Sequence, residues 1–297
     1  MNTETHPRDI YWMSILLIAV GMFFLSACAP IRPSPFAEKV LTPLKNSNAI
    51  TIEQIQGQSQ TFSENSRPLR MALIADSHSN YRDLDLTINQ INQENVDFTV
   101  HLGDMTDLGL AIEYEAATNM LGRLQKPWLT VIGNHDAVGN GRNIYRRIFG
   151  SENQVFDSHG YRFIIFNNNQ LEYLDTGLSW LWLRQQIASS QNPVILFQHA
   201  NPFNTDNFSP DQIQEIQSIL QLPKLRAVFH GHLHSFQQSY FHSVLIQQVG
   251  RTEGQSYAIV DLKPNEVAIK KCEGGSCEGR QFYFPDDTVA EPARSYR

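Results

Sequence analysis

Five apolar runs in this sequence are each followed directly by residues of the types that bind metal ions. The residues that follow the runs are Asp76 and His78, then Asp104, then Asn134, His135 and Asp136, then His199, and finally His232 and His234. Burying carboxylates, imidazoles and an amide at strand ends costs free energy unless these groups share a task. If the strand ends meet at one edge of the fold, their side chains form a single cluster of ligands.

The ligand types restrict the metals that would fit. A carboxylate can bridge two cations, and imidazoles with an amide oxygen complete a shell of nitrogen and oxygen atoms. Because the set contains no thiolate, it suits Mn, Fe, Zn or Co better than a structural zinc–thiolate site or an all-oxygen calcium site. Two divalent ions about 3.5 to 4 Å apart can hold a phosphoryl group and deprotonate a water molecule between them.

The five motifs, taken in order, resemble those of the calcineurin-like metallophosphoesterase superfamily. They are D-x-H at 76–78, G-D-x-x-D at 103–107, G-N-H-D at 133–136, the single His199, and G-H-x-H at 231–234. The resemblance extends from about Leu69 to the strands beyond His234. It implies a metal-dependent phosphodiesterase or phosphomonoesterase that attacks a small phosphate ester with a metal-bridging hydroxide. The spacing of the G-D-x-x-D and G-H-x-H motifs leans toward the bacterial phosphodiesterase-like branch.

The resemblance also implies a role for each matching residue. It assigns Asp76, His78 and His234 to one metal, Asp104 to the bridge, and Asn134, His199 and His232 to the other metal, as a pair of divalent or mixed-valence ions. His135 would stabilise the phosphoryl charge and protonate the leaving oxygen, while Asp136 would orient the His135 ring. Asp107 is expected to support a ligand from behind or to shape the loop, because the family motif includes it without clear metal binding.

The elements that must position these residues alternate between strand and helix in the first half. Residues 69–75, 98–102 and 127–132 fit buried strands, with helices at 81–93 and 111–124 between them. This order predicts parallel strands with right-handed crossovers.

The second half is less regular. We expect a hairpin at 154–168, a helix at 179–189, buried strands at 193–198 and 225–230, and antiparallel strands after His234. Residues 49–56 fit either a strand or a short helix. The predicted fold is therefore a four-layer α/β/β/α sandwich, in which helices flank two packed mixed β-sheets and the dinuclear metal site lies at the carboxyl ends of the strands.

The N-terminal segment predicts export. Residues 10–27 carry no charge and lead into Leu-Ser-Ala-Cys at 25–28, which resembles a bacterial lipoprotein signal, although Glu4 and Asp9 weaken its positive start. The resemblance implies removal of residues 1–27 and attachment of lipid, such as palmitate, to Cys28. The alternative is an uncleaved membrane anchor, since about 18 apolar residues can just cross a bilayer. Residues 28–66 would form a spacer and N-terminal extension, residues 67–297 the phosphoesterase domain, and the cell envelope is the expected location.

Two cysteines near the C-terminus bracket a short glycine-containing loop. Cys272 and Cys277 enclose Glu-Gly-Gly-Ser, and in an exported protein such a pair can close as a disulfide at the tip of a hairpin. The alternative is two free thiols. A zinc site would need more ligands than this pair offers.

The charge balance limits the partners. The chain has a formal net charge of -7, with 41% hydrophobic and 18% charged residues, so it is globular and lacks the basic stripe that nucleic acid would require. Arg142, Arg146 and Arg147 could contact phosphate or form a solvated helix face. The alternative to an enzyme is an inactive, metal-bound envelope scaffold, and the presence of the proton donor His135 argues against it.

Overall fold

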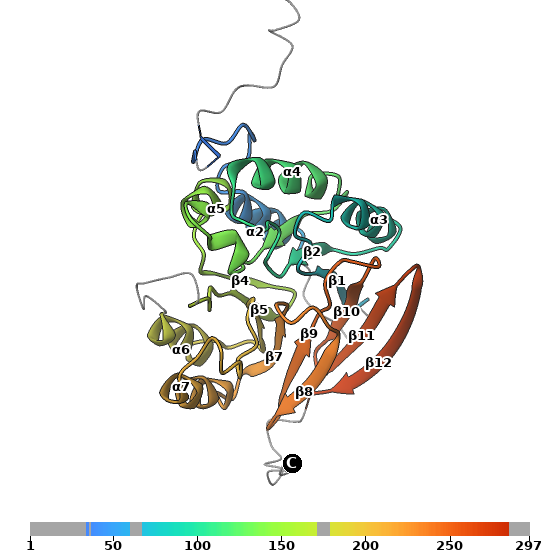
Figure 1. Ribbon diagram of the computed structural model, residues 1–297. Coiled ribbons are helices and arrows are strands. Elements are labelled where there is room, and N and C mark those ends of the chain that lie inside the picture. The colour runs from blue at the N-terminus through green and yellow to red at the C-terminus, as the bar shows by residue number, and fades with distance from the viewer. Residues whose placement is uncertain (1–33, 36, 60–66, 171–178, 285–297) are drawn as a thin grey trace, which may run out of the picture. The chain divides into compact units, whose positions relative to one another are not determined.

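The computed structural model describes residues 34–35, 37–59, 67–170 and 179–284 (Figure 1). The chain divides into two units, Met1–Ala37 and Glu38–Arg297, and all of the elements named below belong to the second unit. Within the described ranges, no helix has both the length and the apolar character that crossing a membrane requires. The predicted signal segment and Cys28 lie outside the described residues.

The first sheet combines parallel and antiparallel strands in the order β12-β11-β10-β1-β2-β3. Its strands are β1 (Leu69–Ile74), β2 (Phe98–His101), β3 (Trp128–Thr130), β10 (Tyr257–Lys263), β11 (Glu266–Glu273) and β12 (Ser276–Tyr283). β1, β2 and β3 are parallel, whereas β10, β11 and β12 follow β1 as antiparallel neighbours. The carboxyl ends of the three parallel strands therefore share one edge.

The second sheet has the order β4-β5-β6-β7-β9-β8. Its strands are β4 (Gln154–Ser158), β5 (Tyr161–Ile165), β6 (Val194–Phe197), β7 (Leu225–His230), β8 (Gln237–Phe241) and β9 (Val244–Gln248). β5, β6, β7 and β9 are parallel, and the antiparallel strands β4 and β8 form the two edges. The predicted hairpin turns at His159 and Gly160, where the backbone φ angles are 49° and 72°.

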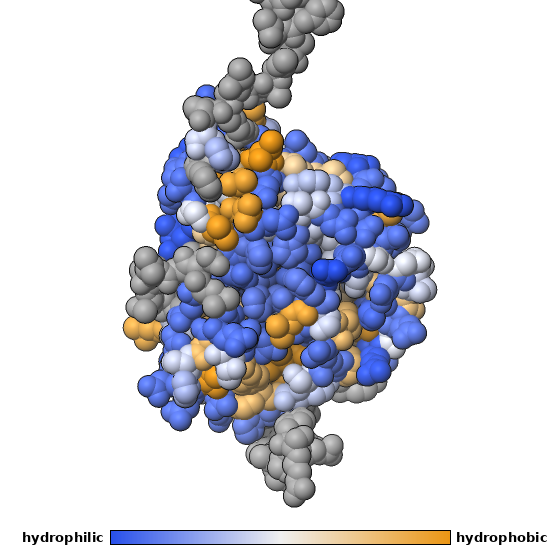
Figure 2. Space-filling model, in the orientation of Figure 1, coloured by the Kyte–Doolittle hydropathy of each residue, from blue (hydrophilic) through white to orange (hydrophobic). Residues whose placement is uncertain are grey.

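The main core lies between the two sheets. Because side chains alternate along a strand, Met71 and Leu73 of β1 enter this core, while Ala72 and Ile74 point to the outer face. Phe163 of β5 packs into the same core from the opposite sheet. The apolar side chains are thus mostly inside, and the face seen in Figure 2 is largely hydrophilic.

Helices cover the outer faces of both sheets (Figure 1). On the first sheet, α3 (Tyr81–Ile91) and α4 (Ala111–Leu121) bury apolar residues, and α5 (Gly141–Phe149) packs beside α4. On the second sheet, α6 (Trp180–Ala188) and α7 (Pro210–Leu220) do the same. These layers confirm the predicted α/β fold with two mixed sheets flanked by helices.

The segment that fitted either a strand or a helix is helical. α2 (Ser47–Gly57) lies beside β3 and β4, within the unit that begins at Glu38. Asn48 on this helix is fully buried, donates to the Thr130 carbonyl oxygen at 2.8 Å and accepts from the Thr130 amide at 3.1 Å. This side chain occupies the free hydrogen-bonding edge of β3, which would otherwise be open to another strand.

Candidate metal centre

The loops that follow β1, β2, β3, β6 and β7 bring the predicted ligands together. Among the residues that the structure describes, two groups have ligand atoms that all lie within 4.8 Å of one another: Asp76 with His78 and His234, and Asp104 with His199 and His232. The ligands come from both sheets, because β1, β2 and β3 belong to one and β6 and β7 to the other. The centre therefore lies where the carboxyl ends of two sheets meet, rather than along a single sheet edge.

One group of side chains converges around His199. Its Nε2 lies 3.1 Å from Asp104 Oδ2 and 3.2 Å from Asn134 Oδ1. His232 Nδ1 lies 3.0 Å from Asn134 Oδ1 and 3.3 Å from His199 Nε2. Two oxygens and two nitrogens from four chain segments thus surround a small volume, as ligands of one metal would.

The other group contains Asp76, His78 and His234. His78 Nε2 and His234 Nε2 are 3.4 Å apart, and His234 Nε2 lies 3.7 Å from Asp76 Oδ1. The remaining nitrogen of His78, Nδ1, lies 3.2 Å from Asp107 Oδ1. Asp107 thus lies behind a predicted ligand, in agreement with its expected supporting role.

The backbone at these positions is unusual. Five of the seven predicted ligands have positive φ angles: Asp76 at 49°, His78 at 45°, Asp104 at 56°, His232 at 76° and His234 at 58°. Non-glycine residues rarely adopt this left-handed conformation, and such strain is typical of functional sites, where the surrounding structure must hold it. The loops are therefore shaped around the positions of the ligand atoms.

Two glycines leave the space that the carboxylates occupy. A Cβ atom on Gly133 would lie 2.0 Å from Asp104 Oδ1, and one on Gly231 would lie 2.5 Å from Asp76 Oδ2. Any side chain at either position would displace a predicted ligand. Glycine at both positions thus lets the backbone of these loops lie directly against the two carboxylates.

Two of the buried predicted ligands carry protons that a bound metal would displace. Burial, together with the neighbouring Asp104 carboxylate, outweighs the lowering effect of His199 and raises the pKa of Asp76 to about 8. Burial alone would lower the pKa of His199, but the Asp104 carboxylate outweighs it and raises that pKa to about 9. Burial likewise opposes ionisation of Asp104, yet His199 and its neighbours lower the Asp104 pKa to about 2. The protein alone therefore keeps His199 protonated and Asp76 neutral at pH 7.

The donor atoms fit two divalent cations. His199 Nδ1 donates to the Leu102 carbonyl oxygen at 2.8 Å, which directs Nε2 into the centre, as is usual for metal-binding histidines. Burial lowers the pKa of His232 to about 4, so its ring is neutral and can bind a metal at pH 7. Two cations would also offset the closely spaced carboxylates of Asp76 and Asp104.

His135 lies beside the ligands in a fixed orientation. Its backbone amide donates to Asp104 Oδ1 at 2.9 Å, and its ring centroid lies 4.8 Å from that of His78. Its Nδ1 lies 2.8 Å from the Asp107 carbonyl oxygen, which can only accept, so Nδ1 carries the hydrogen. Nε2 is then the atom of the ring that is left to exchange a proton with a substrate.

The predicted role of Asp136 needs correction. Its carboxylate accepts hydrogen bonds from the amides of Gly133 at 3.0 Å, Asp104 at 2.8 Å and Thr106 at 2.9 Å, and also from the Thr106 hydroxyl. Within the described part of the chain, no hydrogen bond joins it to the His135 ring. The Asp107 carbonyl oxygen orients that ring, whereas Asp136 ties the loop after β2 to the loop after β3.

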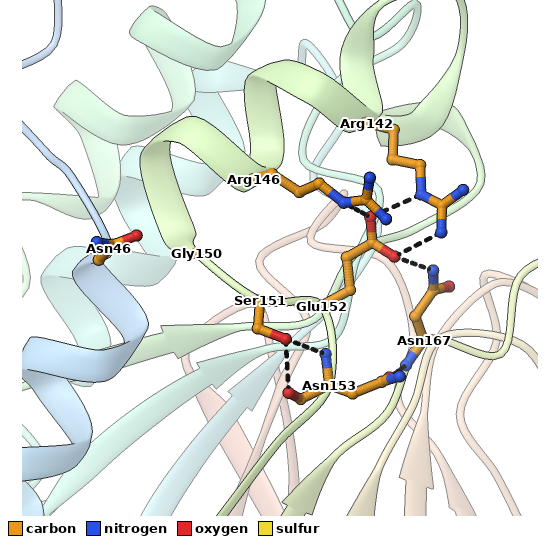
Figure 3. Close-up of a pocket in the computed structure, with 8 residues that line it drawn as sticks. All are labelled: Asn46, Arg142, Arg146, Gly150, Ser151, Glu152, Asn153 and Asn167. Atoms are coloured by element: carbon orange, nitrogen blue, oxygen red, sulfur yellow. Dashed lines mark hydrogen bonds and ion pairs between the residues drawn. The ribbon is translucent and has the colours of Figure 1, made fainter. Parts of the chain in front are cut away.

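The arginines of α5 are paired with carboxylates. Arg142 Nε and Arg146 Nε each lie 2.7 Å from Glu152 Oε1, beside a pocket of about 430 Å³ (Figure 3). Arg147 Nη2 lies 3.3 Å from Glu38 Oε2. Arg146 and Arg147 are still about half exposed, so contact with phosphate and a solvated helix face both stay as predictions for this helix.

Sequence reasoning missed three buried asparagines that follow β5. Asn167, Asn168 and Asn169 are all at least 95% buried, and two of them contact the ligand-bearing loops directly. A signal was present, because these polar residues follow the apolar run at 163–166, as the ligands follow theirs.

The family profile of calcineurin-like phosphoesterases (Metallophos) matches residues 69–236. This is more than half of the chain, and the protein belongs to the calcineurin-like phosphoesterase family. Together with the fold and the two ligand groups, this membership makes it a metal-dependent hydrolase of phosphoester bonds.

Individual relatives are more distant. The glycerophosphodiester phosphodiesterase GpdQ of Enterobacter lignolyticus is 26% identical over 202 residues, which are 60% of this chain and 71% of that protein. A probable cyclic nucleotide phosphodiesterase of Rhodopseudomonas palustris is 24% identical over 230 residues, 64% of this chain and 82% of that protein. Among solved structures, a dimetal phosphatase from Danio rerio has a TM-score of 0.62 at 13% identity and covers 74% of this chain and 100% of its own. That structural likeness shows a shared fold.

Proposed function

We propose that the protein is a phosphodiesterase that hydrolyses a small phosphate diester at a dinuclear metal centre. The observation that carries this proposal is the convergence of all seven predicted ligands beside the oriented ring of His135. Two relatives named as phosphodiesterases, of glycerophosphodiesters and cyclic nucleotides, support a diester over a monoester. The net charge of -7 supports a small substrate over nucleic acid.

The residues would divide the work as follows. Asp76, His78 and His234 would hold one metal, Asn134, His199 and His232 would hold the other, and Asp104 would be the ligand common to both. Mn, Fe or Zn fits this set of nitrogen and oxygen donors. When bound, two such ions supply an activated water molecule and neutralise phosphate charge.

His135 would act on the leaving group. The Asp107 carbonyl oxygen holds its Nδ1 hydrogen, so a protonated ring presents Nε2–H toward the substrate. That proton stabilises charge on the phosphoryl oxygens and then passes to the departing alkoxide. The chain thus needs no side-chain nucleophile and no phosphoenzyme.

The test compares turnover with metal content. Mn-loaded protein is expected to hydrolyse bis-p-nitrophenyl phosphate faster than p-nitrophenyl phosphate. The His135→Ala variant should lose about 100- to 10,000-fold in turnover, because general acid catalysis contributes this much, yet keep two ions per chain. Asp104→Ala should lose metal. Full activity in the His135→Ala variant would refute the assignment of the proton donor.

The alternative is a binding scaffold without turnover. Wild-type protein that binds two metals yet hydrolyses neither ester would favour it. A metal-supplemented screen of cyclic nucleotides, glycerophosphodiesters, sugar nucleotides and phospholipids would then identify the natural ester or extend the negative result.

We also propose that the enzyme is a lipoprotein of the cell envelope. The main support is in the sequence: an uncharged stretch at 10–27 leads into Leu-Ser-Ala-Cys, with Cys28 as the proposed site of lipid attachment. A pair of cysteines that can form a disulfide, Cys272 and Cys277, suits the oxidising conditions outside the cytoplasm.

A further inference from the structure

Shortly after β5 come three consecutive buried asparagines, Asn167, Asn168 and Asn169. Each of their side chains is at least 95% buried, and each makes hydrogen bonds inside the protein. Burying a carboxamide is costly unless its donors and acceptors are satisfied. Three in a row at the carboxyl end of a strand beside the metal centre therefore call for a physical explanation.

Asn168 holds the backbone that carries His199. Its Oδ1 accepts from the His199 amide at 3.2 Å and from the Ala200 amide at 3.0 Å, and its Nδ2 donates to the Ala200 carbonyl oxygen at 2.8 Å. One side chain thus fixes both peptide groups around a predicted ligand. Two of its three bonds use the side-chain oxygen as acceptor.

Asn169 holds the strand end that leads to Asn134. Its Nδ2 donates to the Ile132 carbonyl oxygen at 2.7 Å, two residues before the predicted ligand. The same Nδ2 donates to Asn167 Oδ1 at 3.1 Å, so the Asn169 side chain acts as a donor in both bonds. Its own Oδ1 has no hydrogen-bond partner in the described structure.

The base of this arrangement is an ion-paired carboxylate. Asn167 Nδ2 donates to Glu152 Oε2 at 2.8 Å, and Glu152 in turn binds Arg142 and Arg146 of α5 (Figure 3). Glu152 is 6% exposed and therefore constrained by its partners rather than by solvent. Asn167 is thereby fixed, and it fixes Asn169.

The two anchored segments carry ligands of the same predicted metal. His199 Nε2 and Asn134 Oδ1 are 3.2 Å apart, although β6 and β3, which lead to them, belong to different sheets. We infer that Asn168 and Asn169 are positioning residues that set the spacing of these two ligands across the sheet boundary, and so tune the affinity of the metal bound by Asn134, His199 and His232. This inference rests on the proposed function, which assigns these ligands to a metal.

The experiment is a titration of metal-free, full-length protein with Mn(II), monitored by calorimetry. Wild type is expected to bind two ions. Asn168→Ala and Asn169→Ala should each lower the affinity for the ion held by Asn134, His199 and His232 by about 10- to 100-fold, the usual effect of removing a group that orients a ligand. The affinity for the other ion should stay unchanged. Loss confined to one ion is the readout that a general loss of stability would not give.

Aspartate variants sharpen the test, because they keep the side-chain volume. Asn168→Asp retains the oxygen that accepts from the His199 and Ala200 amides. This variant should therefore bind the ion held by Asn134, His199 and His232 more tightly than Asn168→Ala does. Asn169→Asp loses the Nδ2 group that donates to the Ile132 carbonyl oxygen. It should bind the same ion no more tightly than Asn169→Ala does. The comparison between the two aspartate variants, in which Asn168→Asp is expected to bind this ion more tightly than Asn169→Asp, decides the inference even where an alanine variant fails to fold.

Asn48→Ala is the matched control. Asn48 is equally buried and also bonds to backbone groups of a ligand-bearing strand, at Thr130, yet it lies at the outer edge of β3. The Asn48→Ala variant should have a lower midpoint of urea denaturation, while its affinities for both metal ions should be unchanged. The inference would be overturned if the variants of both Asn168 and Asn169 bound metal as wild type does, or if the affinities for both ions fell equally. Either result would leave the proposed function standing. A wild-type protein that binds fewer than two ions would overturn the proposed function as well.

Discussion

At the residue scale, metal binding depends on a proton that lies between two predicted ligands, His199 and Asp104. In the metal-free protein His199 and Asp104 form a buried ion pair, 3.1 Å apart, and Asp76 is neutral at pH 7. A cation that occupies these positions must displace protons, because only the free nitrogen and the free carboxylate can bind it. The electrostatics of the apo site and its metal affinity are therefore linked.

This linkage predicts how affinity changes with pH. The pKa of His199 is raised to about 9 and that of Asp76 to about 8, so both groups are protonated at pH 7 and metal binding releases protons. Affinity should rise as the pH increases from about 6 and level off near 9. Titration calorimetry at pH 7 in two buffers of different ionisation enthalpy measures the release. Identical heats in both buffers would contradict the prediction.

A second prediction concerns Gly133. Alanine there would place a Cβ atom 2.0 Å from Asp104 Oδ1, so the carboxylate must move and metal should be lost, with a stability cost of about 1 to 3 kcal/mol. The matched control is Gly57→Ala at the end of α2, where a Cβ atom would meet nothing within 4 Å. Metal analysis and urea denaturation of both variants check this. A Gly133→Ala variant that retains two ions would count against Asp104 as the bridge.

At the scale of elements, the hairpin of β11 and β12 closes with a covalent link. Cys272 and Cys277 are paired across the two strands and joined by a disulfide, and Gly274 and Gly275 supply the positive φ angles of the turn, 57° and 85°. β10 separates this hairpin from β1 and its ligands. Its disulfide therefore acts on stability rather than on chemistry.

Removal of the disulfide should lower the free energy of unfolding only mildly. A double Cys272→Ala, Cys277→Ala variant opens a loop with a sequence separation of only 5 residues, so the chain-entropy loss corresponds to about 2 kcal/mol of unfolding free energy. Urea denaturation with and without reductant measures it, and esterase turnover should stay near the wild-type value. A large fall in turnover would show that the hairpin is coupled to the metal centre.

At the scale of the whole molecule, catalysis depends on how the two sheets meet. Each sheet alone holds part of the ligand set: Asp104 and Asn134 follow strands of one sheet, and His199 and His232 follow strands of the other. The core between the sheets, which includes Met71, fixes their separation. Core packing is therefore also a determinant of metal geometry.

The proposed lipid anchor makes a prediction about the whole chain. In cells that express the protein and are fed labelled palmitate, the protein should become labelled, and Cys28→Ser should abolish the label because it removes the site of lipid attachment. Cys272→Ala is the control, because it removes a different cysteine and should keep the label. Label that persists in the Cys28→Ser variant would refute the proposed anchor.

The sequence by itself determined the local features. Short apolar runs predicted β1, β2, β3, β6 and β7, and the alternation with helices predicted the layered α/β fold, because hydrophobic periodicity reflects which faces are buried. The types and order of the ligands were also visible, since ligand chemistry is a property of individual side chains. It did not decide whether residues 49–56 form a strand or a helix.

Only the tertiary structure decided which groups meet. The partner that orients His135 is the carbonyl oxygen of Asp107, and every residue carries a carbonyl, so no residue type could mark it. Asp136 follows His135 in sequence but binds the backbone of another loop. The anchoring of His199 by Asn168 likewise joins two strand ends that lie 31 positions apart. Hydrogen bonds between distant segments depend on how the sheets pack, and a local pattern does not contain that information.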